Sequence, residues 1–231
     1  MKAGIISAGE GSRLRSEGLT TPKPLIEVGG VPLIGRLIQT FLRHGITEIA
    51  CIVNEYSLQV KEYVESLHLE IPVRFVVKTT PSSMHSLFAL APYLQDGQFL
   101  LSTVDPIFDE KEFSDYLNYC RLHPASDGIL AITRFIDDEH PLYVQLNEQH
   151  QIESFSKSGR TEWITGGMYV FSPVIFREME GALQNRIERL RNFLNFLLSQ
   201  GYCLEGFPFS KIVDVDHRHD IAVAEKLLNL H

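Results

Sequence analysis

The stretch Met1–Gly35, MKAGIISAGEGSRLRSEGLTTPKPLIEVGGVPLIG, decides the fold of this chain. Its apolar run at residues 3–7 is typical of a buried strand, and the glycine-punctuated loop AGEGSR follows at residues 8–13. Ligands of open α/β sheets bind beyond the carboxyl ends of the strands. Gly9 and Gly11 would let backbone N–H groups approach a phosphate closely in this loop. A tight strand-to-helix turn without a ligand stays open as the alternative.

Two well-known phosphate-binding motifs do not fit this loop. The dinucleotide fingerprint requires glycine at its sixth position, where this chain has Leu14. The P-loop requires a Gly-Lys-Ser/Thr end, which the segment lacks. The glycine loop therefore needs a different interpretation.

A lysine between two prolines gives a more specific signal. Pro22 fixes its own φ angle, and Pro24 pushes the preceding Lys23 toward an extended conformation. The sequence thus predicts that Lys23 is held on a stiff, non-helical segment. A preorganised ammonium that faces phosphates needs little reorganisation during a reaction. A solvated loop lysine is the alternative, which the nearby Arg13 and the glycine loop make weaker.

Composition excludes several classes of function. The 231 residues are 44% apolar and 22% charged, as in ordinary globular proteins. The net charge of −8 argues against nucleic-acid binding, which requires a basic surface. No apolar run approaches the ~20 residues of a membrane span, and we expect no membrane partner. The three cysteines are far apart and favour buried thiols, so we expect a cytoplasmic protein without a signal segment.

Strand and helix patterns alternate along the first half, which is typical of βαβ units with a mostly parallel sheet. We expect strands at residues 3–7, 46–53, 73–77 and 98–104, with helices at 33–44, 57–67 and 83–94. In the second half we expect strands at 128–134, 143–146, 152–155, 166–171, 202–207 and 211–215, with helices at 112–123, 187–200 and 220–228. The prediction is one Rossmann-like three-layer α/β domain, residues 1–231, with a mixed, mostly parallel central sheet. Its front half, 1–110, would bind a nucleotide, and its back half, 111–231, a second substrate.

Residues 7–38, SAGEGSRLRSEGLTTPKPLIEVGGVPLIGRLI, resemble the signature of the sugar-phosphate nucleotidyltransferases. That family carries an Ala-Gly-x-Gly-Ser/Thr-Arg-Leu loop, then Pro-Lys-Pro-Leu, then Gly-x-Pro-Leu-Ile. The resemblance implies the fold of nucleotide-diphospho-sugar transferases. It also implies a reaction in which a phosphorylated sugar or alcohol attacks the α-phosphorus of a nucleoside triphosphate and pyrophosphate leaves. Arg13 would hold the β- and γ-phosphates, and Lys23 would neutralise charge at the α-phosphate.

The resemblance further implies Mg²⁺, which proteins hold with one or two carboxylates. Asp105 follows the fourth expected strand, although the residue before it is Val104 instead of the family's usual glycine. The second carboxylate would be Asp216 or Asp214, which would share one face of a strand, and we favour Asp216. Asp220 is expected to be the N-cap of the last helix. His217 and His219 suggest a zinc site as an alternative. This alternative is weaker, because no third ligand is evident.

The substrate-binding residues follow from the same resemblance. The base would lie against Ala8, Gly9, Gly11 and Ser12 of the loop and against Ser83 and His85 of a serine-rich segment. That segment more closely resembles the cytidylyltransferase branch of the family, in which choline phosphate is one acceptor. A serine cap with a packed histidine is the alternative. The acceptor would bind Lys157, Glu162 and Gly167. Trp163 could line that pocket and suit a quaternary ammonium, although a core or rim position is the better expectation.

The main hypothesis is therefore a Mg²⁺-dependent nucleotidyltransferase. One alternative is a catalytically idle relative that binds a nucleotide sugar, against which the joint presence of Arg13, Lys23, Asp105 and Asp216 argues. Another is a glycosyltransferase, against which the lysine of Pro-Lys-Pro-Leu argues. The sequence leaves the nucleobase, the acceptor and the oligomeric state open.

Overall fold

The opening apolar run forms the central strand of the molecule. In the computed structural model, which describes residues 1–9, 11–136, 140–158 and 161–229, this strand is β1 (Lys2–Ser7). It pairs in parallel with β4 (Glu48–Val53) on one side and β6 (Phe99–Thr103) on the other. The parallel edge strand β5 (Val73–Val77) follows β4. The carboxyl ends of these four strands therefore meet at one edge of the sheet.

The other half of the sheet is largely antiparallel. Its strands are β8 (Gly128–Thr133), β9 (Tyr143–Leu146), β10 (Ile152–Ser156), β11 (Trp163–Phe171) and β12 (Leu204–Phe209). Strand β11 runs antiparallel to both β6 and β8, whereas β12 is parallel to β8. The β9–β10 hairpin joins the sheet through the first residues of β11. The mixed α/β sheet that the sequence predicts is thus confirmed.

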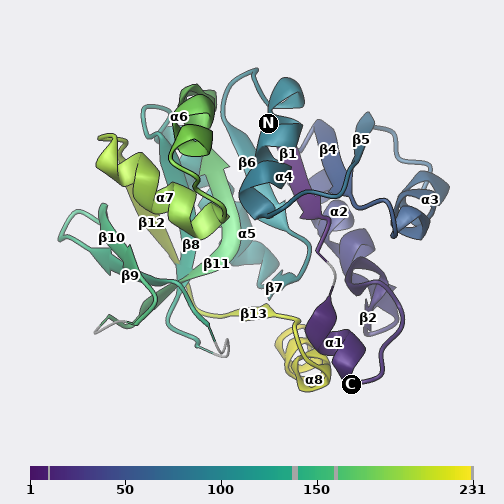
Figure 1. Ribbon diagram of the computed structural model, residues 1–231. Helices are drawn as coiled ribbons and strands as arrows, with labels where there is room; N and C mark the ends of the chain where they lie inside the picture. Colours follow the sequence, from purple (N-terminus) through teal and green to yellow (C-terminus); the bar gives the residue numbers. More distant parts are fainter. Residues whose placement is uncertain (10, 137–139, 159–160, 230–231) are drawn as a thin grey trace.

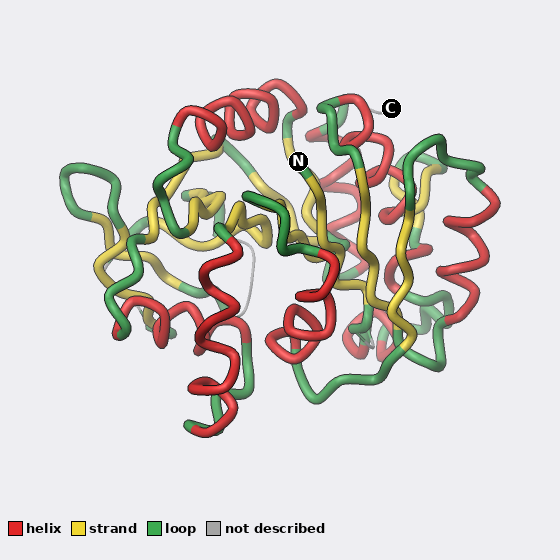
Figure 2. The backbone as a smooth tube through the Cα atoms, turned by 90° about the horizontal axis from the view of Figure 1, so that it is seen from above, coloured by secondary structure: helices red, strands yellow, loops and turns green. Residues whose placement is uncertain are grey.

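Helices cover both faces of the sheet, so that the chain has three layers (Figures 1 and 2). One face carries α2 (Leu33–Arg43), α3 (Leu58–Ser66) and α5 (Glu110–Leu122). The other carries α4 (Ser83–Leu90), α6 (Met179–Gln184) and α7 (Leu190–Ser199), and the short 3-10 helices η2 (Ala91–Tyr93) and η3 (Pro173–Glu178). Because strand side chains alternate, Ile5 packs into the first core and Ile6 into the second.

A third, smaller core lies beyond the sheet edge and holds together short elements from the beginning, the middle and the end of the chain. They are α1 (Ser12–Ser16), β2 (Glu27–Val28), β3 (Val31–Pro32), β7 (Pro106–Phe108), β13 (Ile212–Asp214) and α8 (Arg218–Leu227). Its buried members are Leu14, Ile26, Val28, Leu33, Ile107, Val213, Val215 and Ala224. In Figure 1, α1 and α8 lie beside each other below β13. This core brings residues of the first 30 positions next to residues beyond 210.

The segment around Lys23 is not extended as the prolines predict. Residues Lys23–Leu25 form one turn of 3-10 helix, η1. The Leu25 N–H donates to the Pro22 carbonyl at 2.8 Å, and the Ile26 N–H donates to the Lys23 carbonyl at 3.1 Å. The prediction was wrong because the steric preference that Pro24 imposes on Lys23 is outweighed by the two hydrogen bonds of this turn, whose acceptors are carbonyls that the prolines leave available. The segment remains fixed, now by a closed turn.

The start of α8 also differs from the prediction, since Asp220 is not its N-cap. His217 occupies that position, and Asp220 is the third helical residue in a capping box. The Asp220 Oδ2 atom accepts hydrogen bonds from the N–H groups of Asp216 (2.9 Å) and His217 (2.6 Å). A carboxylate at this position can reach back to donors before the helix, which lets α8 begin at Arg218, earlier than predicted.

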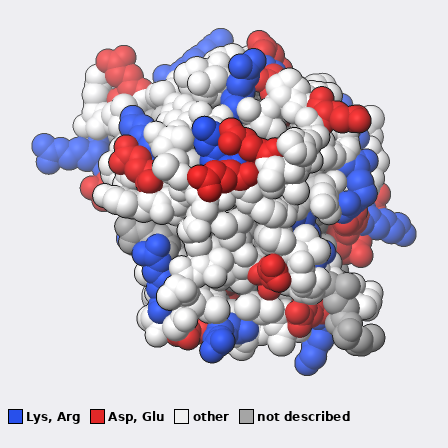
Figure 3. Space-filling view, turned by 90° about the vertical axis from the view of Figure 1, so that its right-hand side faces the viewer, with Lys and Arg blue, Asp and Glu red and all other residues white. Residues whose placement is uncertain are grey.

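The surface carries charges of both signs. Acidic and basic side chains are interspersed on the face that Figure 3 shows. Within the described ranges, no helix is both long and apolar enough to cross a membrane.

Candidate active site

Four side chains that the sequence singles out meet at the carboxyl edge of the sheet. The Lys23 ammonium forms ion pairs with Asp105 Oδ2 and, at 2.5 Å, with Asp216 Oδ1. The Arg13 guanidinium pairs with the other oxygen of Asp216 at 2.6 Å. Arg13 and Asp216 are 203 positions apart in the sequence. We call these four residues the charged quartet.

Short elements around the third core place the two carboxylates. Asp105 lies between β6 and β7, and its carbonyl accepts a hydrogen bond from the Val215 N–H at 3.2 Å. Strand β7 pairs antiparallel with β13, with Pro106 opposite Asp214. The sequence analysis missed β7, whose three residues begin with a proline. This short pairing brings Asp105 next to the segment that carries Asp216.

The expectation that Asp214 and Asp216 share one strand face is wrong, because β13 ends at Asp214. The Asp216 N–H bonds to the Asp214 carbonyl at 3.0 Å, so the chain turns between them. Asp216 thereby joins the charged quartet. Asp214 lies instead against β11, where a Cβ built on Gly167 would be 3.7 Å from its Oδ1 atom.

Gly167, an expected acceptor-binding residue, is packed tightly beside the quartet. Its φ angle is +73°, and an added Cβ would lie only 2.7 Å from Thr103 Oγ1. The Thr103 hydroxyl donates to the Gly167 carbonyl at 3.4 Å. A side chain here would push β11 away from β6, so glycine is needed for the close approach of these strands.

The electrostatics keep the Lys23–Asp105 pair ionised. Lys23 is only 11% exposed, and burial opposes its charge, but Asp105 and Asp216 raise its pKa above the ordinary lysine value. Burial likewise opposes ionisation of Asp105, and the Lys23 ammonium lowers the pKa of that carboxyl below its usual range. Each buried charge therefore stabilises the other, and loss of one partner would leave an uncompensated charge.

The glycine loop supports the cations of the quartet. Gly11 precedes α1 with a φ of +59°, and a Cβ there would lie 3.0 Å from the Lys23 Cβ. Gly9 has no positive φ angle, and a Cβ on it would meet no atom within 4 Å. Gly11 thus has a left-handed backbone, whereas Gly9 does not. Ser12 opens α1 beside Arg13, whereas Glu10 lies outside the described residues.

A second ion pair fastens α1 to α8. Glu17 accepts from His217 Nδ1 at 2.6 Å and from the Arg218 N–H at 2.8 Å. His219 pairs with Asp220 at 3.0 Å. His217 and His219 therefore contact carboxylates within the protein, which is a different role from the zinc ligation considered as an alternative. Within the described part of the chain, no group of three or more His, Cys, Asp or Glu side chains is arranged to hold a metal ion.

The residues present nevertheless fit a magnesium ion that a substrate would help to bind. Mg²⁺ takes oxygen ligands and is usually held by one or two carboxylates together with phosphate oxygens. Asp105 and Asp216 supply two such carboxylates. The Asp105 Oδ1 atom is buried and meets no donor in hydrogen-bond geometry among the described residues. It is therefore an acceptor that remains available to a cation.

A basic pocket opens beside the quartet and contains cations that the sequence analysis missed. Its volume is about 360 Å³. It is lined by Arg13, His140, Pro141, Lys157, Arg189 and Arg191. Among these six described residues there is no carboxylate. The pocket can hold an anionic ligand, and its lining contains both Arg13 and Lys157, which the resemblance assigns to the acceptor.

Arg189 and Arg191 enter the pocket from the start of α7. Arg189 is its N-cap, and Arg191 Nη1 donates to the His140 carbonyl at 3.2 Å. Basic residues at a helix N-terminus oppose the helix dipole, which favours anions there. Arg189 and Arg191 both lie near the start of the helix that the sequence predicts over residues 187–200, and this unfavourable placement is the signal that could have revealed them.

Two expected acceptor-side residues lie outside this pocket. Glu162 is 74% exposed and forms an ion pair with Arg134 at 3.4 Å. The Arg134 guanidinium also covers the Trp163 ring, 4.5 Å from its centroid. Trp163 lines a separate hollow with the β9–β10 hairpin, so it has the rim position that we expected.

The serine-rich segment begins α4 and touches α7. Ser82 is the N-cap residue, and its hydroxyl lies 2.9 Å from His85 Nδ1. Ser83 Oγ accepts from the Leu190 N–H at 3.3 Å. The candidate base-binding segment is therefore connected directly to the helix that supplies Arg189 and Arg191.

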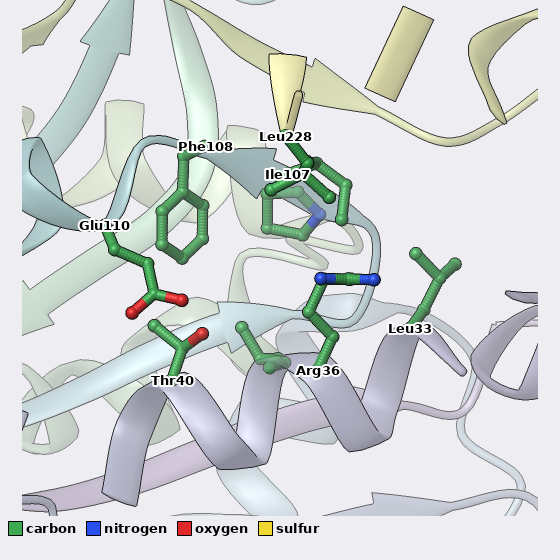
Figure 4. A pocket seen from close by; sticks show the side chains of 9 residues that line it. Leu33, Arg36, Thr40, Ile107, Phe108, Glu110 and Leu228 are labelled. Atoms are coloured by element: carbon green, nitrogen blue, oxygen red, sulfur yellow. The ribbon is translucent and has the colours of Figure 1, made fainter. Parts of the chain in front are cut away.

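A further hollow between α2, β7 and the end of α8 does not suit a substrate. Arg36 points into it from α2 toward β7 (Figure 4). Its Nη2 atom donates to the Val28 carbonyl at 2.6 Å. The volume is about 20 Å³, enough for about one water molecule. We therefore place the candidate site at the quartet and the basic pocket.

Comparisons with known proteins agree with this geometry. A family model described as nucleotidyl transferase matches residues 2–215. The chain belongs to the nucleotidyl transferase family. The mannose-1-phosphate guanylyltransferase catalytic subunit beta of Dictyostelium discoideum is 28% identical over 216 residues, covering 90% of this chain and 60% of that protein. A mannose-1-phosphate guanyltransferase of Emericella nidulans is 29% identical over 195 residues, covering 78% and 52%. The chain thus spans between half and two thirds of the length of these relatives.

Two solved structures share the fold of this family member. The inositol-1-phosphate CTP transferase from T. maritima has a TM-score of 0.82 at 21% identity, covering 99% of this chain and 95% of that one. A putative glucose-1-phosphate thymidylyltransferase from Bacillus anthracis, in complex with a sucrose, has a TM-score of 0.85 at 18% identity, covering 98% and 94%. The predicted fold class is confirmed by both.

Proposed function

We propose that this chain joins a nucleoside triphosphate to a phosphorylated sugar or related alcohol and releases pyrophosphate. The observation that carries the proposal is the charged quartet, in which two cations and two carboxylates from distant segments converge beside a basic pocket. The expected reaction needs a triphosphate site and an acceptor-phosphate site side by side, and the quartet and the basic pocket would be these two sites. The family membership and the names of the relatives support the same reaction class.

The residues of the quartet would act by charge and position. Lys23 would stabilise the negative charge that develops at the α-phosphate, and Arg13 would hold the leaving pyrophosphate. An acceptor phosphate is already an anion, so the reaction requires alignment and charge stabilisation and no strong general base. Asp105 and Asp216 would hold Mg²⁺, and Asp214 is a weaker candidate. When bound, the ion would neutralise charge on the phosphate oxygens.

The acceptor phosphate would bind in the basic pocket. Lys157, Arg189 and Arg191 present donors there, and arginine suits the two-pronged recognition of phosphate. The same pocket disfavours a quaternary ammonium acceptor such as choline phosphate, because its described lining is cationic. The only tryptophan already has a guanidinium over its ring. We therefore favour a sugar or polyol phosphate, the kind of acceptor that the relatives' names contain.

The base would lie between the glycine loop and the start of α4. Ala8, Gly9, Gly11 and Ser12 offer backbone groups, and the Ser82–His85 pair offers polar side-chain atoms. We further propose a cytoplasmic location, which the three free cysteines among the described residues support.

A release assay tests the proposed function. The full chain, with Mg²⁺, is incubated with each of the four nucleoside triphosphates and with a panel of hexose, cyclitol and choline phosphates. We expect pyrophosphate from one preferred triphosphate and only with a phosphorylated sugar or polyol. No pyrophosphate from any pair, despite tight binding of a nucleotide sugar, would support the idle binding relative instead.

A further inference from the structure

The cations proposed for the substrate are paired with the carboxylates proposed for the metal. Lys23 bridges Asp105 and Asp216, and Arg13 holds the second oxygen of Asp216. Two positive and two negative groups thus balance one another. A metal ion that used the same oxygens would have to displace Lys23 or lie beside its ammonium, where like charges repel.

The position of Lys23 is built into the fold. Its side chain is 11% exposed, its Cβ lies against Gly11, and its backbone is closed into the η1 turn. The stem is thus fixed while the ammonium lies between the carboxylates of Asp105 and Asp216, which come from distant segments of the chain. Ion pairs at exposed sites contribute little to stability, so an exposed lysine would not be held between two carboxylates in this way. Because Lys23 is buried, its positive charge must be balanced by the neighbouring carboxylates.

We propose that Lys23 is an internal counter-ion that fills the metal site until a triphosphate arrives. The inference rests on the proposed function, since it assigns Asp105 and Asp216 to the metal. Triphosphate oxygens would draw Lys23 and Arg13 away from the carboxylates, which would then accept a divalent cation. Metal and triphosphate therefore bind with positive cooperativity, and each strengthens the binding of the other by the same factor.

The first test measures Mn²⁺ binding to the full chain without nucleotide, through the electron paramagnetic resonance signal of free Mn²⁺. Lys23→Met should bind Mn²⁺ at least about tenfold more tightly than the wild type, within the usual range of coupling between sites. Lys111→Met is the matched control, because Lys111 is exposed and lies outside both the charged quartet and the basic pocket, and its Mn²⁺ affinity should equal that of the wild type. Lys23→Met combined with Asp105→Asn should lose the gain. An unchanged affinity of Lys23→Met would overturn the proposal.

A reciprocal test does not depend on the folding of Lys23→Met. Asp105→Asn should bind inorganic tripolyphosphate more tightly than the wild type in a metal-free buffer, because Lys23 loses one competing carboxylate. Equal or weaker binding would contradict the inference. Both tests are independent of turnover. A gain in Mn²⁺ affinity in a chain that releases no pyrophosphate would support the counter-ion and reject the proposed activity.

Discussion

Gly11 and Lys23 are in direct contact, and this contact links the glycine loop to the site. Gly11 has a left-handed backbone that disfavours any side chain, and its missing Cβ leaves room for the Lys23 stem. Gly9, only two positions earlier, has neither constraint from the protein. The open space around Gly9 is where a ligand could approach the backbone. The two glycines therefore have separate roles.

A pair of substitutions separates these roles. Gly11→Ala should lower the free energy of unfolding by about 1–2 kcal/mol, because alanine resists a positive φ angle. It should also reduce activity through displacement of Lys23. Gly9→Ala should leave stability within about 0.5 kcal/mol of the wild type and weaken triphosphate binding. Urea unfolding measures the change in stability, and nucleotide titration measures the change in triphosphate binding. Equal stability of Gly11→Ala and Gly9→Ala would refute the separate roles of the two glycines.

Helices α8 and α7 position side chains of the candidate site through residues at their N-termini. Asp220 at the start of α8 accepts from the Asp216 N–H and so orients the segment that carries a quartet carboxylate. The N-terminal turn of α7 places Arg189 and Arg191 at the basic pocket and meets α4 through Ser83. Small changes at either helix end should therefore affect the site.

The capping box of α8 gives a stability prediction. Asp220→Ala should cost about 1–2 kcal/mol, because the N–H groups of Asp216 and His217 lose their acceptor. His219→Ala is a suitable control, since that side chain is 66% exposed, and the change removes its ion pair with Asp220 and its ring contact with His217 but leaves the Asp220 carboxylate in place. Thermal unfolding of both variants measures the difference. A control as unstable as Asp220→Ala would argue against the cap.

The basic pocket gives a kinetic prediction. Arg189→Ala should raise the KM for the acceptor by about 10-fold or more, the loss expected when a charged hydrogen bond to phosphate is removed. The KM for the triphosphate should change much less. Arg177→Ala, which alters an exposed arginine outside the pocket, should leave both values unchanged. A rise confined to the triphosphate KM would place the acceptor elsewhere.

Across the whole molecule, surface ion pairs connect distant segments and make stability depend on pH. The hydrogen bond from His217 and that from the Arg218 N–H lower the pKa of Glu17 below the ordinary 4.5. The hydrogen bond from Arg43 is the main cause that lowers the pKa of Glu110. A carboxyl whose pKa is lower in the folded state stabilises the fold when ionised. This contribution is complete above the ordinary value and is lost as the pH falls through the folded-state value.

The free energy of unfolding should therefore decrease as the pH falls below about 4.5. Urea titrations between about pH 3 and pH 7 would measure the slope. Glu110→Gln should show a shallower decrease over the same interval, because one of the shifted carboxyls is absent. A variant with the slope of the wild type would contradict the role of the Arg43–Glu110 pair.

Much of the fold and half of the site follow from local patterns in the sequence. The glycine loop and the two prolines draw attention to Arg13 and Lys23, whereas Asp105 and Asp216 follow from the family resemblance and from their places after expected strands. The sequence does not predict strand β7, because three residues that begin with proline are too few to show a periodic pattern. The basic pocket depends on how α7 lies beside the β9–β10 hairpin, which no local pattern specifies. The same long-range packing decides that Glu162 pairs with Arg134 instead of facing the pocket.

The central claim is that Lys23 stabilises a reacting triphosphate. The direct measurement is the rate of pyrophosphate release by the wild type and by Lys23→Ala at saturating triphosphate and acceptor. We predict a kcat lower by about 10²–10³-fold for the variant, the usual cost of removing one preorganised charge-stabilising group. The native circular dichroism spectrum should be retained. A variant that folds normally and releases pyrophosphate as fast as the wild type would contradict the account.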